Sequence, residues 1–363
     1  MTPFMEPSLP DRKRLDDYLD GIYERRWLTN NGPLLQELTV RLEEYLGVKN
    51  LLLLSSGTAA LQVAYRALQI DENVQDGPAE VITTPFTFVA TESSLKWQGL
   101  RPVFADICPD TLNLCPQKTA ALINDRTRAI VPVHVFGNPC EVSAFAELSA
   151  KSDLKLVYDA AHAFGVRIGG QSVLNFGDAA ILSFHATKVF NTVEGGGIVF
   201  KDTDAYESAC EIINFGRGAQ TAKINRVGIN AKMSEVHAAF GLALLHDIDA
   251  ILEQRIELLS IYENGLPTTL RRPLWDESVS QNAAYMPVLF GSVRERQECE
   301  QALGRASIPT RRYFSPCLGD DQVIGDLKVA RSAAERILCL PLHAGMNTKE
   351  AQRAVAAVST IIK

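Results

Sequence analysis

The chain has 363 residues, of which 46% are hydrophobic and 22% charged, and its formal net charge is −7. A chain of this length and composition buries a large core and usually forms two domains. The acidic balance disfavours nucleic acid as a partner, and no apolar run approaches the roughly 18 residues of a membrane span. The first residues lack the apolar segment of a secretory signal, so we expect a cytoplasmic protein with no membrane partner.

Cysteine and histidine are scattered along the chain. The seven cysteines show no C-x-x-C spacing, and the six histidines form no H-E-x-x-H motif. This pattern is typical of reduced core thiols, and it predicts neither a disulfide framework nor a metal site.

From residue 51 to residue 201, short apolar segments alternate with helical patterns. A helix over 30–47 precedes them, and further helices are expected over 57–69 and 87–99. The expected strands cover 51–56, 80–85, 101–106, 128–135, 155–160, 179–184 and 197–200. Strands that are apolar from end to end and separated by helices indicate a mainly parallel sheet covered on both faces. The predicted fold class is therefore α/β, of the doubly wound kind.

The last third of the chain has a different character. A helical pattern over 233–264 is longer than most globular helices and suits a connection between two domains. A strand over 283–290 and helices over 292–304 and 348–362 then indicate a smaller α+β domain. We expect a large α/β domain over residues 1–245, with its N-terminal helical segment, and a small C-terminal domain over 246–363.

Small polar residues follow the first strand, where a helix begins. Ser56, Gly57 and Thr58 are predicted at its N-terminus, whose N–H groups and dipole attract a phosphate. An ordinary serine cap explains the same residues, and the fingerprints of P-loop and dinucleotide-binding proteins are absent. Phe88, just past the second strand, could stack on a planar ring or pack in the core.

Polar residues also stand at the ends of two later strands. Asp159 follows an apolar strand and precedes His162 by three residues. A carboxylate there is costly unless it meets a cation or donors, so Asp159 either holds a protonated ring nitrogen or caps a turn. Ser183 ends the next strand, and Lys188 follows it. A half-buried lysine beside strand ends has a lowered pKa and is nucleophilic, whereas a solvated loop lysine is neither.

In chain order, these residues supply a phosphate loop, an aromatic ring, an aspartate, a serine and a lysine. Ligands of parallel α/β proteins gather at the carboxyl ends of the strands. A phosphate-bearing pyridine aldehyde needs a phosphate anchor, a ring face, a carboxylate for its ring nitrogen and an amine for a Schiff base. The sequence therefore predicts a site for pyridoxal 5′-phosphate (PLP).

The chain resembles the PLP-dependent nucleotide-sugar aminotransferases of the DegT/DnrJ/EryC/StrS group, which belong to the fold type I aminotransferase class. The resemblance runs through the ordered blocks SSGTAAL, TTPFTFVAT, PVHVFGNPCEV, VYDAAHAFGV, SFHATKVFNTVEGGGIVF, GINAKMSEVHAAFGLALL and LPLHAGM. It implies a PLP-binding sheet domain followed by a smaller domain. Some relatives carry histidine in place of the lysine and catalyse dehydration, so Lys188 implies a transaminase.

The resemblance also implies roles for single residues. Lys188 would hold the cofactor and move protons, Asp159 would pair with the ring nitrogen, and His162 would lie beside the ring. The other implied cofactor contacts are Ser56, Gly57, Thr58, Phe88, Ser183 and Asn230. Asn230 would reach the phosphate of the neighbouring subunit in a homodimer with interfacial sites. The alanine and lysine after Asn230 depart from the usual tyrosine and arginine, which puts that contact in doubt.

The implied reaction is amino transfer from glutamate to a nucleotide-linked ketosugar. The blocks look most like those of enzymes that convert dTDP-4-keto-6-deoxy-D-glucose to dTDP-4-amino-4,6-dideoxy-D-glucose, for lipopolysaccharide O-antigen or another glycan. Amination at carbon 3, a UDP- or GDP-linked 4-ketosugar, another fold type I reaction such as cysteine desulfuration, and a PLP-binding regulator without activity stay open. Expected substrate contacts are His185, Tyr313 and His343; the last two could equally pack within the small domain.

Overall fold

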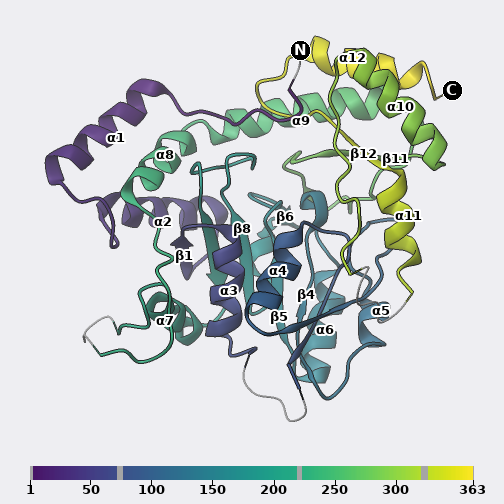
Figure 1. The fold of residues 1–363 in the computed structure, drawn as a ribbon. Helices are drawn as coiled ribbons and strands as arrows, with labels where there is room; N and C mark the ends of the chain where they lie inside the picture. Colours follow the sequence, from purple (N-terminus) through teal and green to yellow (C-terminus); the bar gives the residue numbers. More distant parts are fainter. Residues whose placement is uncertain (1–2, 72–76, 219–222, 320–325, 363) are drawn as a thin grey trace.

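The structure is a computed structural model that describes residues 3–71, 77–218, 223–319 and 326–362. A seven-stranded sheet forms its centre (Figure 1). In spatial order the strands are β1 (Leu51–Leu54), β9 (Gly196–Phe200), β8 (Ala179–Ser183), β5 (Lys155–Asp159), β4 (Thr127–Val131), β2 (Glu80–Thr83) and β3 (Arg101–Phe104). From β8 to β3 all neighbours are parallel, whereas β9 is antiparallel to both β1 and β8. The predicted mainly parallel sheet is confirmed.

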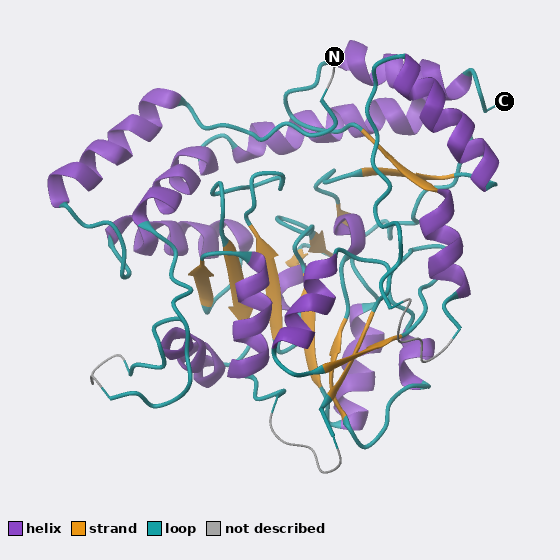
Figure 2. Cartoon of the chain, in the orientation of Figure 1, coloured by secondary structure: helices purple, strands orange, loops and turns teal. Residues whose placement is uncertain are grey.

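Each strand of this sheet packs apolar side chains on both faces. Leu52 and Leu54 join one hydrophobic core, whereas Leu51 and Leu53 join the other. On the first face lie α3 (Gly57–Ala67), α4 (Val89–Trp97) and α7 (Thr203–Ile212). On the other lie α2 (Pro33–Leu46), α6 (Val142–Ser152) and α8 (Glu235–Leu245). Strand side chains alternate between faces, so continuous apolar strands require this double helical cover, which Figure 2 shows.

The single helix expected over 233–264 is two helices. Helix α8 ends at Leu245, and α9 (Ile248–Gly265) begins after an interruption at Asp247. The interruption is stabilised from α1 (Arg12–Arg25), a helix that the sequence did not predict: Arg14 Nη1 donates to Ala243 O at 3.2 Å and to Asp247 Oδ2 at 2.9 Å. The predicted division after residue 245 falls at this break and stays a prediction.

The C-terminal part has its own core around a two-stranded antiparallel sheet. That sheet pairs β11 (Met286–Leu289) with β12 (Ile337–Leu340), and its core also takes in side chains of α9. Around it lie α10 (Val293–Arg305), α11 (Lys328–Arg336) and α12 (Thr348–Ser359). The remaining short elements are α5 (Pro116–Ala120), β6 (Arg167–Ile168), β7 (Gln171–Ser172), β10 (Val279–Ser280) and the 3-10 turns η1 (Val135–Gly137) and η2 (Val173–Asn175).

One buried carboxylate ties this C-terminal part to the large sheet. Asp106, just after β3, accepts hydrogen bonds from the N–H groups of Val329 at 3.0 Å and Ala330 at 2.9 Å. These donors lie in the first turn of α11, where helix N–H groups have no partner within the helix and the dipole favours an anion. The contact fixes α11, and the core that it covers, against the carboxyl edge of the sheet.

Two further observations concern the described residues as a whole. Across residues 3–362, apart from the gaps given above, no helix is both long and apolar enough to cross a membrane. Within the same described ranges, no group of three or more His, Cys, Asp and Glu side chains is placed to hold a metal ion. All seven cysteines are free thiols.

At Gly196, the backbone of β9 touches the backbone at the start of α3, so there is no room for a side chain. A Cβ at Gly196 would lie 2.5 Å from the carbonyl carbon and oxygen of Ser56. We expect Gly196→Ala to lower the free energy of unfolding by about 1–3 kcal/mol, the usual penalty for overpacking, in urea denaturation followed by circular dichroism. Gly304→Ala is the matched control, since nothing lies within 4 Å of its Cβ position. Equal stability of Gly196→Ala and the wild type would contradict this view of the β9–α3 contact.

Candidate active site

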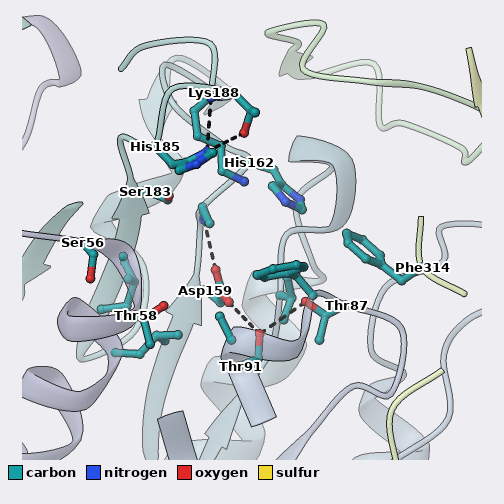
Figure 3. A pocket seen from close by; sticks show the side chains of 18 of the residues that line it. Ser56, Thr58, Thr87, Thr91, Asp159, His162, Ser183, His185, Lys188 and Phe314 are labelled. Carbon is teal, nitrogen blue, oxygen red and sulfur yellow. Dashed lines mark hydrogen bonds between the residues drawn. The ribbon is translucent and has the colours of Figure 1, made fainter. Parts of the chain in front are cut away.

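A cavity of about 360 Å³ opens at the carboxyl ends of β5 and β8. It collects the predicted site residues, except Asn230 and His343, from segments far apart in the chain. Those that line it are Ser56, Gly57, Thr58, Phe88, Asp159, His162, Ser183, His185, Lys188 and Tyr313. Figure 3 shows the labelled side chains around this one space, with Lys188 and Asp159 pointing into it.

One end of the cavity is the N-terminus of α3. Ser56 is its cap, and its Oγ accepts from Ala59 N at 3.1 Å, so the capping interpretation holds for this hydroxyl. Gly57 and Thr58 follow in the first turn, whose N–H groups lack partners within the helix. A Cβ at Gly57 would lie 2.9 Å from Ser183 Cβ, so glycine lets the turn approach the end of β8. The result is a cradle for an anion, made of helix N–H groups and the side chains of Thr58 and Ser183.

Lys188 is half-buried and enters the cavity from the loop after β8. Its N–H donates to His185 O at 2.8 Å, which holds the loop in a tight turn. Burial lowers the pKa of the Lys188 amine to about 8, and the nearby Asp159 carboxylate opposes that shift. The shift has the direction that the sequence predicted, and it leaves a minority of this amine unprotonated near neutral pH, a larger share than in an exposed lysine.

Asp159 ends β5, and its two oxygens have different partners. Oδ2 accepts from Thr91 Oγ1 at 2.8 Å, and Oδ1 accepts from Ala161 N at 3.1 Å. Burial raises the pKa of the Asp159 carboxyl, whereas these two hydrogen bonds and the Lys188 amine lower it. The donors and the amine are what a buried carboxylate needs to remain ionised.

His162 is held as a neutral ring beside Asp159. Its Nδ1 accepts from Phe136 N at 3.3 Å, which leaves the proton of the neutral ring on Nε2. Burial, with a smaller contribution from Lys188, holds the pKa of His162 well below its usual value. The ring is parallel to Phe314, with centroids 5.9 Å apart, and meets the Tyr285 ring at 4.9 Å.

Phe88 presents the ring face that a planar ligand would use. It is the N-cap residue of α4 and 59% exposed, although it lines the cavity. Phe86, two residues earlier, is completely buried and belongs to the core. The stacking interpretation of Phe88 is thus compatible with its position, and the core interpretation is not.

Several lining residues were not predicted from the sequence. They are Thr87, Thr91, Glu194, Tyr285 and Phe314. The two threonines stand four residues apart at the start of a helix, a spacing that places both on one face and could have identified them. Tyr285 and Phe314 come from the C-terminal part of the chain, and no local pattern connects them with strands more than 100 residues away.

Asn230 and His343 lie outside the cavity of their own chain. Asn230 is exposed and pairs with Asn214 as an isolated bridge. His343 is 1% exposed, and its Nε2 lies 3.2 Å from Pro3 O and its Nδ1 3.8 Å from Glu6. The N-terminal segment therefore covers the His343 ring, and the packing alternative fits its position better than a substrate contact.

The cavity fits PLP as judged by its own groups. The α3 cradle matches the phosphate, the open Phe88 ring matches a pyridine face, and Asp159 matches a protonated ring nitrogen. Lys188 supplies an amine with a lowered pKa, which an aldehyde requires. Each group that the cofactor needs is present on one wall or another of the same cavity.

Comparison with known proteins agrees with the PLP site that these cavity residues indicate. Residues 11–359 match the model of the DegT/DnrJ/EryC1/StrS aminotransferase family. A dTDP-4-amino-4,6-dideoxy-D-glucose transaminase of Shigella dysenteriae is 41% identical, with 98% of both chains covered. One of the same name from Escherichia coli is 36% identical, with 95% of this chain and 94% of the relative covered. The structure of DesI with its TDP-sugar product has a TM-score of 0.90 and 32% identity, covering 99% of this chain and 92% of DesI.

The chain is a PLP-dependent enzyme of the α/β aminotransferase class. It belongs to the DegT/DnrJ/EryC1/StrS aminotransferase family, since that family's model covers nearly all of it. The fold that the sequence predicted, a mainly parallel sheet with helices on both faces and a further α+β part, is the fold of its structural neighbours. Its cofactor is PLP, on which the aminotransferases of this family depend.

Proposed function

We propose that the protein transfers an amino group from L-glutamate to carbon 4 of dTDP-4-keto-6-deoxy-D-glucose, giving dTDP-4-amino-4,6-dideoxy-D-glucose. The observation that carries this proposal is the 41% identity, over 98% of both chains, to a transaminase named for that product. We place the enzyme in the cytoplasm, which its free thiols support. A nucleotide-activated amino sugar is a glycosyl donor by its chemistry, so we assign the product to a surface polysaccharide such as O-antigen.

Three residues around the cofactor would have different chemical roles. PLP, when bound, supplies a protonated ring that withdraws electrons from the reacting carbon–nitrogen unit. Lys188 would hold the cofactor through its aldehyde, and its amine, whose pKa burial lowers to about 8, would move a proton at the reacting carbon. The Asp159 carboxylate, held by its two hydrogen bonds, would keep the ring nitrogen protonated, and the neutral His162 would offer its Nε2–H beside the ring.

A second group of residues holds the cofactor in place. The first turn of α3, with Gly57 and Thr58, and the Ser183 hydroxyl bind the phosphate, and Ser56 fixes that turn as its cap. Phe88 covers one face of the ring, which is consistent with its open, exposed position at the cavity wall. These contacts would hold the cofactor in the cavity that Lys188 also lines.

His185 and Tyr313 line the same cavity as the residues assigned to the cofactor. Thr187 N donates to His185 Nδ1 at 3.3 Å, and the Nε2 atom of the same ring lies 3.8 Å from Glu194 Oε1. We propose that this His185–Glu194 pair and the Tyr313 hydroxyl donate to and accept from the sugar oxygens. Both side chains are accessible enough to meet a ligand.

We also propose that two copies form a homodimer with active sites at the interface. Apolar side chains are exposed on the segment that carries Asn230; they are Phe215, Ile224, Val227 and Ile229. A contiguous exposed apolar surface is typical of an interaction site. Packing against a second copy would bury it and would bring Asn230 to the phosphate of the neighbouring cofactor.

The proposed substrate predicts an order of preference among nucleotide-linked ketosugars. With PLP and glutamate, we expect dTDP-4-keto-6-deoxy-D-glucose to be aminated at carbon 4, with kcat/KM at least about 100-fold higher than for UDP- or GDP-linked ketosugars. Product mass and NMR identify the aminated carbon, and release of 2-oxoglutarate identifies the donor. Lys188→Ala is the control and should give no product. Amination at carbon 3, or preference for another nucleotide, would contradict the assignment.

The dimer proposal predicts complementation between two inactive variants. Lys188→Ala lacks the amine, and Asn230→Asp sets a carboxylate against the phosphate of the neighbouring site. Random mixing should restore about a quarter of wild-type activity, because half of the dimers are hybrids with one intact site each. The unmixed variants serve as controls, and light scattering gives the oligomeric state. A mixture as inactive as its components, with hybrids present, would show that Asn230 does not act across the interface.

A further inference from the structure

Two threonines of the α4 region form a hydrogen-bonded row that ends on Asp159. Thr91 Oγ1 donates to Asp159 Oδ2 at 2.8 Å, and Thr87 Oγ1 lies 3.3 Å from Thr91 Oγ1 (Figure 3). Both side chains are buried: Thr91 is 1% exposed and Thr87 3%. Asp159 is 68 residues from Thr91 in sequence, so only the fold brings the row together.

The direction of the row follows from the number of protons available. A hydroxyl has one proton, and Thr91 gives its proton to the Asp159 carboxylate. The contact with Thr87 must therefore be accepted by Thr91 and donated by Thr87. Successive donors aligned this way polarise one another and strengthen the last bond, which here meets a carboxylate.

The usual alternative for a helical threonine does not apply to Thr91. A threonine inside a helix commonly returns its hydroxyl to the carbonyl of the preceding turn. Thr91 instead sends its hydroxyl across to β5, and the carbonyl of Thr91 accepts from Ser94 Oγ at 3.0 Å. The side chain is thus turned toward the cavity, where the cofactor ring nitrogen would lie.

Burial, two hydrogen-bond donors and one charged group set the pKa of the Asp159 carboxylate. Burial raises the pKa of Asp159, and the Thr91 hydroxyl, the Ala161 N–H and the Lys188 amine oppose that effect. Burial, with a smaller contribution from the Asp159 charge, in turn raises the pKa of the Tyr65 and Cys140 side chains. Among the residues that the structure describes, Thr91 is the one side-chain hydroxyl that bonds this carboxylate, and it bonds the oxygen that Ala161 leaves free.

We propose that Thr91, backed by Thr87, is a positioning residue that keeps Asp159 ionised and aimed at the ring nitrogen of PLP. The inference rests on the role proposed above for Asp159. Thr91 acts through that carboxylate, so its effect depends on the presence of a ring nitrogen. A threonine that only shaped the cavity would affect any ligand of the same size equally.

The test compares two ligands that differ at one atom. Apo-protein is titrated with PLP and with 1-deazapyridoxal 5′-phosphate, in which carbon replaces the ring nitrogen, and binding is followed by tryptophan fluorescence. Both ligands keep the aldehyde and phosphate, so attachment to Lys188 cancels in the comparison. Wild type should prefer PLP. Thr91→Val should bind PLP about tenfold more weakly, the effect of one buried hydrogen bond to a charged group, and the analogue within about twofold of wild type.

Matched variants separate the hydroxyl from the packing. Thr91→Ser and Thr91→Ala both lose the methyl group, but only the alanine loses the hydroxyl, so serine should retain the preference for PLP and alanine should lose it. This pair also decides the matter if Thr91→Val does not fold. Ser94→Ala removes another buried hydroxyl of α4 that bonds a backbone carbonyl and not Asp159, and it should bind both ligands as wild type does.

The outcomes distinguish failure of this inference from failure of the proposed function. If wild type prefers PLP and Thr91→Val keeps the whole preference, Thr91 is not a positioning residue. Equal losses for PLP and the analogue would assign Thr91 to packing, with the same conclusion. If wild type itself binds the two ligands equally, the role of Asp159 fails, and the Thr91 inference fails with it.

Discussion

Burial of opposite charges in one cavity is the constraint on which this structure depends. Burial of the Asp159 carboxylate raises its pKa, and burial of the Lys188 amine lowers its pKa, so burial favours the neutral form of both groups. Each charge partly offsets that effect on the other, because Asp159 raises the pKa of Lys188 and Lys188 lowers that of Asp159. Hydrogen bonds from Thr91 and Ala161 lower the pKa of Asp159 as well, although burial still leaves it above its ordinary value. The result is an amine that loses its proton more readily than an exposed lysine, beside a carboxylate held by two hydrogen bonds.

The sheet makes this arrangement rigid. Asp159 N donates to Pro132 O at 2.9 Å, and its carbonyl accepts from His134 N at 3.0 Å, so the residue is fixed on the β4 side. On the β8 side it is in register with Ile181. The glycines at 57 and 196 then let the start of α3 approach β8 and β9 more closely than any side chain permits. The anion cradle and the charged pair are therefore both built on the ends of the same sheet.

Much of this was accessible from the sequence, because the strands are apolar throughout and the polar residues that follow them are few. Asp159, Ser183 and Lys188 stand out against such a background, and the structure places all three on one cavity. The sequence-based predictions that the structure did not support concern residues whose partners are distant in the chain. The break between α8 and α9 is held by Arg14, more than 200 residues away, and helical periodicity carries no sign of it. His343 reads as a polar residue near a strand end, yet Pro3 covers it.

Thr91 shows a different limit. Thr91 lies in the same sequence block as Phe88, and nothing in that block indicates a partner for its hydroxyl. The partner, Asp159, is brought opposite Thr91 by the fold, at the end of β5. The C-terminal side chains Tyr285 and Phe314 likewise reach His162 from a part of the chain that Asp106 ties to the sheet through α11. Spacing along a chain identifies residues that share a strand end; it does not identify the residues that support them from another element.

The ionisation of Lys188 in the apo-protein tests the central claim most directly. Brief labelling with isotope-coded acetic anhydride over a pH series, read by peptide mass spectrometry, gives the midpoint for this one amine against the exposed lysines. The account predicts a midpoint near 8, and a lower one in Asp159→Asn, because loss of the carboxylate removes the interaction that stabilises the charged amine. A midpoint at the ordinary lysine value of 10.5, unchanged in Asp159→Asn, would contradict it.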